Sequence, residues 1–210
     1  MLTVGLSLLY FIVTGIQFWV TDYLQTVLNM PQSTVFAFYS LTSISAPVAG
    51  VIAGGSVTHK FGGYQSPNAL KIASVASIVA MASALPVPFV NSFPLFLILL
   101  WMLLFAGGFI VPVVTGIILV SVKPSLRTAA NSLANLSYNL LGYLPAPFLY
   151  GFSVTATGIP RFGMGLIMFT TIPACFLMIW CSIRAERVKE DKLSEPLLSE
   201  VLLEERRDVY

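Results

Sequence analysis

Neutral polar side chains recur at helical spacing near the start of the sequence, inside an otherwise apolar stretch. They follow one another every three or four residues, and at about 100° per residue they share one face of a helix. The set is Thr3, Ser7, Tyr10, Thr14, Gln17, Thr21 and Gln25. Such a stripe can bond a neighbouring helix, or it can line a cavity that holds water or a solute. We favour the cavity, because a mid-helix glutamine and this many hydroxyl groups exceed what packing usually needs.

A second polar stripe contains three asparagines. Its members, which share one side of a helix, are Thr128, Asn131, Ser132, Asn135, Tyr138, Asn139 and Gly142. Amide side chains in a membrane helix are costly unless they bond a partner or water. Tyr138 and Asn139 lie about 15 Å along the helix from Thr128, close to mid-depth, so we expect both to face the cavity. The predicted solute-binding set is Tyr10, Thr14, Gln17, Thr21, Tyr138 and Asn139.

The sequence offers little for catalysis or metal binding. His59 is the one histidine, and there is no glycine-rich phosphate loop. Cys175 and Cys181 are six positions apart in one apolar segment, on opposite faces of a helix, so we expect two small packed side chains. Asp22 is the one acid in residues 1–183, and we expect an interfacial carboxylate there rather than an ion-coupling group. We therefore expect no enzyme activity, cofactor, metal site or nucleic-acid partner.

The composition places most of the chain in lipid. Hydrophobic residues make up 57% of the chain and charged residues 10%, whereas a globular protein has about 25% charged residues. Residues 1–183 contain six charged side chains, and residues 184–210 contain eight acids and six bases. Six charged side chains are too few to cover the surface of a water-soluble domain. Residues 1–184 are therefore predicted to be membrane-embedded, and residues 185–210 to form a polar tail.

Six segments are long and apolar enough to cross a membrane, which takes about 20 residues. They cover residues 2–24, 34–57, 69–90, 95–121, 129–152 and 161–183. Transmembrane barrels would instead need short alternating strands. The predicted fold class is therefore an all-α membrane protein with six transmembrane helices.

The basic residues predict the orientation of these helices. Lys60, Lys71, Lys123 and Arg127 lie in or next to the second-to-third and fourth-to-fifth connections, while Arg161 lies on the other side. Lysine and arginine are enriched in cytoplasmic connections. We therefore expect both termini in the cytoplasm, without a prediction of which membrane holds the protein.

The second predicted helix has a face of small residues, Thr42, Ala46, Gly50 and Gly54, at intervals of four. Small residues on one face let another membrane helix approach closely. We expect this face to pack against a neighbouring helix.

The connection after that helix, residues 55–64, resembles the loop between the second and third helices of each half of major facilitator superfamily transporters. The matching residues are Gly55, Val57, Thr58, Lys60 and Gly62. His59 stands where the family has an aspartate, and Gly63 and Tyr64 replace a basic pair. The missing acid puts the usual charge pairing of this loop in doubt.

A second resemblance covers residues 127–151. The residues that carry it are Arg127, Ala130, Leu141, Gly142, Pro145, Ala146, Pro147, Tyr150 and Gly151. They are similar to the penultimate helix of organic anion transporting polypeptides and of the related spinster-like proteins. Residues 50–61 are also similar to the corresponding organic-anion loop.

The resemblance spans residues 1–184 and implies the C-terminal half of a twelve-helix facilitator fold. Its partners would be membrane lipid, a small-molecule solute, and an N-terminal six-helix half or a second copy. The implied function is secondary transport of a small organic solute, anionic or lipid-like, by alternating access. Closure of the cytoplasmic side would involve Gly55, His59, Lys60, Gly62 and Arg127. The alternative is a six-helix membrane protein that binds, regulates or is inactive, and does not transport.

Overall fold

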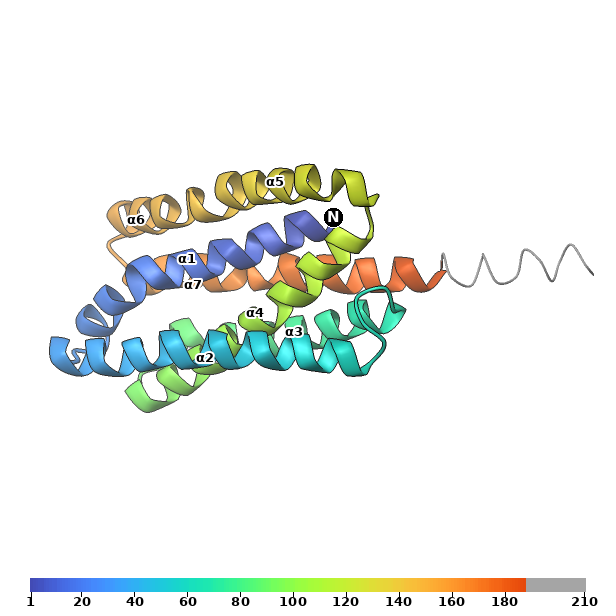
Figure 1. The fold of residues 1–210 in the computed structure, drawn as a ribbon. Helices are drawn as coiled ribbons and strands as arrows, with labels where there is room; N and C mark the ends of the chain where they lie inside the picture. Colours follow the sequence, from blue (N-terminus) through green and yellow to red (C-terminus); the bar gives the residue numbers. More distant parts are fainter. Residues whose placement is uncertain (188–210) are drawn as a thin grey trace, which may run out of the picture.

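The computed structural model describes residues 1–187, which form helices joined by short connections, with no strand in that part of the chain. The long helices lie side by side in a bundle (Figure 1). In chain order they are α1 (Leu2–Thr26), α2 (Gln32–Lys60), α3 (Pro67–Ala84), α4 (Phe93–Val120), α5 (Arg127–Tyr138), α6 (Pro145–Thr157) and α7 (Pro160–Phe169). Short turns are the 3-10 helices η1 (Val87–Phe89) and η2 (Pro124–Leu126) and the π-helix η3 (Asn139–Tyr143). After a break at Thr170, residues 171–187 form a terminal helix.

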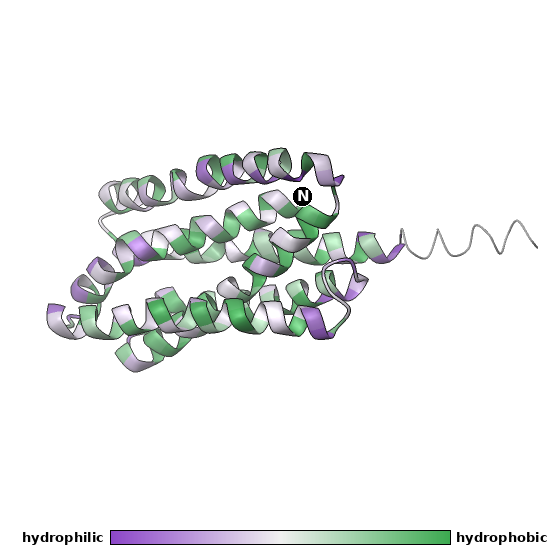
Figure 2. Ribbon diagram, in the orientation of Figure 1, coloured by the Kyte–Doolittle hydropathy of each residue, from purple (hydrophilic) through white to green (hydrophobic). Residues whose placement is uncertain are grey.

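Within residues 1–187, five helical segments are long and apolar enough to cross a membrane. They are Leu2–Thr26, Gln32–Lys60, Pro67–Phe89, Phe93–Val120 and Pro160–Arg187. An all-helical chain with several such segments is compatible with a multi-pass membrane protein, and the all-α prediction is confirmed. In Figure 2, hydrophilic residues gather on α5 and toward the ends of the bundle. Of the predicted polar tail, residues 188–210 lie outside the described part of the chain.

The fifth predicted span, residues 129–152, is not one regular helix. It consists of α5, the π turn η3 and α6, stacked end to end (Figure 1). Pro145 and Pro147 have no backbone N–H, so they cannot donate to the carbonyl groups one turn earlier. The backbone widens just before them, and the N–H of Leu144 donates to the carbonyl of Asn139 at 3.0 Å. The two prolines therefore account for the interruption.

The connections sort into two ends of the bundle, as the sequence predicted. The start of α1, the α2–α3 connection, the α4–α5 connection and the far end of the terminal helix lie at one end, which we call the basic end (Figure 1). There the Lys71 ammonium pairs with the Glu186 carboxylate. At the opposite end the Arg161 guanidinium donates to the side-chain oxygen of Asn91. This contact ties α7 to the connection before α4 and gives Arg161 a structural role.

The predicted small-residue face of α2 packs tightly against α4, so this prediction is confirmed. Thr42, Ala46, Gly50 and Gly54 are all buried. A Cβ atom on Gly50 would lie 2.2 Å from the carbonyl oxygen of Phe105, and one on Gly54 would lie 2.3 Å from that of Phe109. The backbones of the two helices therefore touch, which only glycine permits at these positions.

α1 lies inside the bundle, between the α5–α6 layer and α7 (Figure 1). Leu6, Ile16 and Val20 on this helix are fully buried. A Cβ atom on Gly15 would come within 2.5 Å of the Ile167 side chain. The predicted polar stripe of α1 is thus carried by a helix with neighbours on several sides.

Candidate solute-binding face and loop

Three tyrosine rings meet where α1 crosses the π turn, and we call them the tyrosine cluster. The ring centre of Tyr10 lies 4.9 Å from that of Tyr138 and 5.0 Å from that of Tyr143. The backbones of α1 and the π turn come close here: a Cβ atom on Gly142 would lie only 2.6 Å from the carbonyl oxygen of Ser7. Tilted aromatic pairs at these separations are attractive beyond their buried area. The structure therefore brings together Tyr10 and Tyr138 from the predicted solute-binding set.

Tyr143 belongs to this cluster, and the sequence analysis missed it. On a regular helix, positions five residues apart point in different directions. In η3 the hydrogen bond spans five residues, from Leu144 to Asn139, so residues five apart return to the same face. Tyr138 and Tyr143 can therefore both contact Tyr10. The signal in the sequence was the pair of prolines directly after this turn.

The polar stripe of α1 divides between the interior and the surface. Thr14 is 3% exposed, and its hydroxyl donates to the Tyr10 carbonyl at 2.7 Å. Thr14 is thus satisfied by its own helix and lies away from the open face on which it was expected. Gln17 is exposed, while Tyr10 and Thr21 are half-buried. Gln17 is therefore the most accessible member of the predicted set on this helix.

α5 and the first residue of η3 present a row of asparagines, Asn131, Asn135 and Asn139, all exposed; we call it the asparagine face. The Asn135 amide donates to the Asn131 carbonyl at 2.9 Å, and the Asn139 amide donates to the Asn135 carbonyl at 2.8 Å. These bonds use one N–H of each amide, and no other hydrogen bond to these two amides exists within residues 1–187. Two amide oxygens along this face therefore remain open to an outside donor.

Beyond the π turn, α1 and α6 are joined by a second aromatic contact. The Trp19 ring stacks on Tyr150 at 4.7 Å between centres, and its indole N–H donates to the Pro147 carbonyl at 3.1 Å. The hydroxyls of Tyr138 and Tyr150 are buried without a hydrogen-bond partner in the described residues. Both contacts of α1 with the α5–α6 layer thus include a tyrosine whose polar group is unsatisfied.

The loop that resembles the facilitator motif ends α2 and turns the chain into α3. Gly62 and Gly63 have φ angles of +101° and +74°, which favour glycine. The N–H of Gly63 donates to the Thr58 carbonyl at 2.9 Å, which closes the helix end. The ring of Tyr64 lies against α4, where a Cβ atom on Gly116 would come within 2.5 Å of it.

His59, Lys60 and Arg127 are exposed at the basic end of the bundle. No hydrogen bond or ion pair joins Arg127 to residues 55–64 in the part of the chain that the structure describes. An added Cβ atom on Gly55 would meet nothing within 4 Å. The predicted closing residues therefore share one end of the bundle, and packing within residues 1–187 does not require the glycine at position 55.

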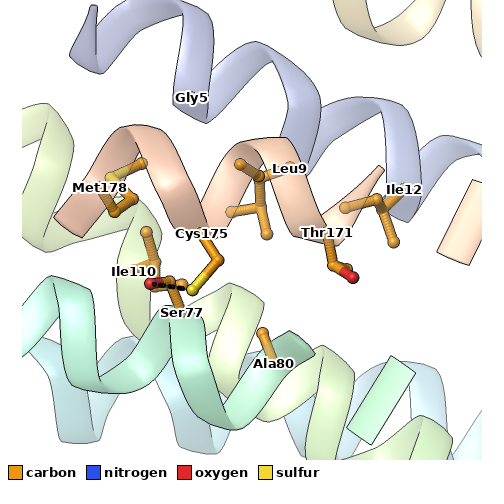
Figure 3. A pocket seen from close by; sticks show the side chains of 10 residues that line it. Gly5, Leu9, Ile12, Ser77, Ala80, Ile110, Thr171, Cys175 and Met178 are labelled. Carbon is orange, nitrogen blue, oxygen red and sulfur yellow. Dashed lines mark hydrogen bonds between the residues drawn. The ribbon is translucent and has the colours of Figure 1, made fainter. Parts of the chain in front are cut away.

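A small cavity of about 20 Å³ separates α1 from α3, α4 and the terminal helix (Figure 3). Ser77 donates to Cys175 Sγ at 3.5 Å on its wall, and Ser74 donates to the Met178 carbonyl at 3.1 Å. The volume suits at most one water molecule. The described residues contain no group of three or more metal-ligating side chains. We assign the serines and the cysteine to helix packing.

Comparison with known proteins adds no family assignment: the chain matches no protein-family model. A comparison with curated proteins finds no match either. The facilitator resemblance therefore remains a prediction, and the function has to be argued from the geometry.

Proposed function

We propose that this protein is a secondary transporter, or one six-helix half of one, that moves a small organic solute by alternating access. The solute would be amphipathic, either anionic or lipid-like. It would contact Tyr10, Gln17, Tyr138, Asn139 and Tyr143 at the tyrosine cluster and the surface beside it. Thr21 lies further along α1, and Thr14 would support the site from the interior.

The asparagine face carries this proposal. Asn135 and Asn139 keep unpaired amide oxygens on an exposed helix surface. An amide without a partner is unfavourable in hydrocarbon by several kcal/mol, on the order of 4 or more. Lipid is therefore the least suitable neighbour for this face. Water, a polar solute or another protein surface would each satisfy it.

The exposed face of α2 differs, and it argues for lipid. Ile44, Val48 and Ile52 are 68%, 55% and 65% exposed. Aliphatic side chains in such a row fit the bilayer interior. The molecule thus has one exposed face suited to lipid and one suited to a polar environment. A transporter half needs both, because it lies against lipid on one side and lines a water-accessible path on another.

The basic end would act as the closing side. Gly55 offers a surface without a Cβ atom and without neighbours, which suits close approach by a second six-helix unit. His59, Lys60 and Arg127 would flank that contact. Tyr64 anchors the loop on Gly116, so movement of the loop would be coupled to α4.

The water-accessible face can be tested with cysteine labelling in reconstituted membranes. Cys175→Ser and Cys181→Ser remove the two native thiols. In that background we expect Asn139→Cys and Gln17→Cys to react with a charged thiol reagent at least about tenfold faster than Ile52→Cys, because only a thiol in water ionises readily. Equal, slow labelling at all three positions would sink the proposed cavity.

Transport itself can be tested with fluorescein, an amphipathic organic anion that can be followed by its fluorescence. We expect the double variant Gln17→Leu/Asn139→Leu to lose fluorescein uptake into vesicles while inserting normally. An Ile44→Leu/Ile52→Leu double variant on α2 is the matched control and should keep uptake. Unchanged uptake in the first variant would contradict the solute-site assignment. Water access without any uptake would favour a binding or regulatory protein.

A further inference from the structure

A second recess lies at the basic end and takes no part in the proposed solute path. We call it the terminal groove; it is bounded by α1, α3, the end of α4 and the terminal helix, and it encloses about 650 Å³. Its inner wall includes the apolar side chains of Leu2, Leu70 and Ile118. Its rim includes Trp180 and Arg184. The groove therefore combines an apolar interior with a cationic edge.

The charge of the described residues at the basic end favours an anion. Within the described residues, the basic end carries six cationic side chains, and Glu186 is its one acid. The six are Lys60, Lys71, Lys123, Arg127, Arg184 and Arg187. Glu186 already pairs with Lys71. The remaining positive charge would attract a negatively charged group to this end.

Trp180 and Arg184 are placed to receive a lipid headgroup. They are four residues apart on one helix, so they occupy the same face. Both are exposed. Tryptophan favours the boundary between headgroups and hydrocarbon, and the guanidinium group binds phosphate with two parallel hydrogen bonds. The apolar wall beneath them matches an acyl chain, which a free phosphate ion lacks.

We propose that the terminal groove binds an anionic glycerophospholipid from the membrane leaflet at the basic end. The phosphate lies on Arg184, the glycerol region lies beside Trp180, and one acyl chain runs along Leu2 and Ile118. The site is separate from the tyrosine cluster and does not depend on transport. Its ligand is a structural or regulatory lipid held between α1 and the terminal helix.

The test uses the full chain purified in detergent, with bound lipid counted by native mass spectrometry during titration. Phosphatidylserine is the anionic probe and phosphatidylcholine the zwitterionic one. We expect phosphatidylserine to bind about fivefold or more tightly than phosphatidylcholine, in keeping with one nearby basic residue. Arg184→Gln should remove this preference, and Arg184→Lys should retain most of it. Arg187→Gln is the matched control and should change the preference less than about twofold, because Arg187 does not line the groove.

Two further arms separate a lipid site from other sources of binding. Ile118→Trp fills the groove and should weaken both lipids, while inorganic phosphate at millimolar concentration should not displace phosphatidylserine. The proposal is overturned if Arg184→Gln and Arg187→Gln lower the preference equally, since that indicates diffuse attraction. Displacement by phosphate alone, or full lipid binding in Ile118→Trp, would also overturn it.

Discussion

The contact between α2 and α4 and the contact between α1 and the α5–α6 layer are built in different ways. The first uses glycines, and the backbones touch at Gly50 and Gly54. The second uses aromatic rings, with Tyr10 between two tyrosines and Trp19 on Tyr150. Glycine contacts leave no room for adjustment. Aromatic contacts include polar groups and a widened helix turn, so they can hold a second arrangement or a ligand.

This difference suggests that the two contacts have different roles. The α2–α4 pair forms a rigid unit, while the α1–α5–α6 unit carries the polar groups that the proposed function needs. Of the two contacts, the second alone contains buried tyrosine hydroxyls without a hydrogen-bond partner in the described residues. They belong to Tyr138 and Tyr150. If the comparison is correct, substitutions in the first contact should affect folding, and those in the second should also affect solute handling.

The largest effect is expected for Gly54→Ala in the first contact. The new methyl group would lie 2.3 Å from the Phe109 carbonyl oxygen, and neither backbone can move aside without separating the helices. We expect a loss of about 3 kcal/mol or more in the free energy of unfolding, measured as thermal unfolding in detergent. Gly55→Ala is the matched control and should be neutral or stabilise by about 0.5–1 kcal/mol. Similar behaviour of the two variants would contradict the rigid contact.

A glycine-to-alanine substitution in the second contact should lower the free energy of unfolding by less. Gly142→Ala places a methyl group 2.6 Å from the Ser7 carbonyl oxygen and 2.9 Å from Tyr10 Cβ. Because the wider π turn can shift, we expect a loss of about 1–3 kcal/mol together with a change in tyrosine fluorescence. Gly151→Ala, whose methyl group would meet Trp19 at 3.4 Å, should be tolerated. A larger loss at Gly142 than at Gly54 would reverse the ranking of the two contacts.

The glycine contact and the aromatic contact also differ in how well the sequence predicts them. Small residues at intervals of four are visible in the sequence, and they place the α2–α4 contact correctly. The tyrosine cluster needs the π turn, which changes the helical register, and so Tyr143 could not be placed from regular periodicity. Thr14 was expected on an open face because the stripe shows which residues share a side, not which neighbour covers that side.

The sequence also predicts helix boundaries better than it predicts irregular turns within a helix. The six apolar segments and their turn residues predict nearly all of the helical structure. Pro145 and Pro147 mark the interruption within residues 129–152, but the π turn directly before them is seen only in the structure. The exposed amides of the asparagine face were visible in the sequence. Their bonds along the helix, which leave the oxygens open, required the structure.

Two tryptophans allow a finer comparison, since each donates a hydrogen bond across one of the contacts. Trp101 donates to Ser45 Oγ at 3.1 Å across α2 and α4, and Trp19 donates to the Pro147 carbonyl at 3.1 Å. Trp101→Phe should lose about 0.6 kcal/mol, an average value for such bonds in membranes. Trp101 also stacks on Phe105, but both residues belong to α4, whereas Trp19 stacks on Tyr150 across the contact. Trp19→Phe should therefore lose about 1 kcal/mol more, because only this change weakens a stack between two helices. Chemical unfolding of both variants would measure this, and equal losses would show that the aromatic stack adds nothing.

The smallest effect, and the one most informative about the site, is expected for Tyr138→Phe. The hydroxyl of Tyr138 is buried without a partner in the described residues, so removing it should leave stability unchanged or raise it by up to about 1 kcal/mol. Tyr150→Phe is the matched control, since its hydroxyl is also unpaired, and it should behave in the same way. Thermal unfolding should be measured with and without fluorescein. If Tyr138→Phe alone destabilises the protein, its hydroxyl bonds water or a solute that enters between α1 and the π turn. That result would narrow the proposed solute site to the tyrosine cluster and remove the surface beside it.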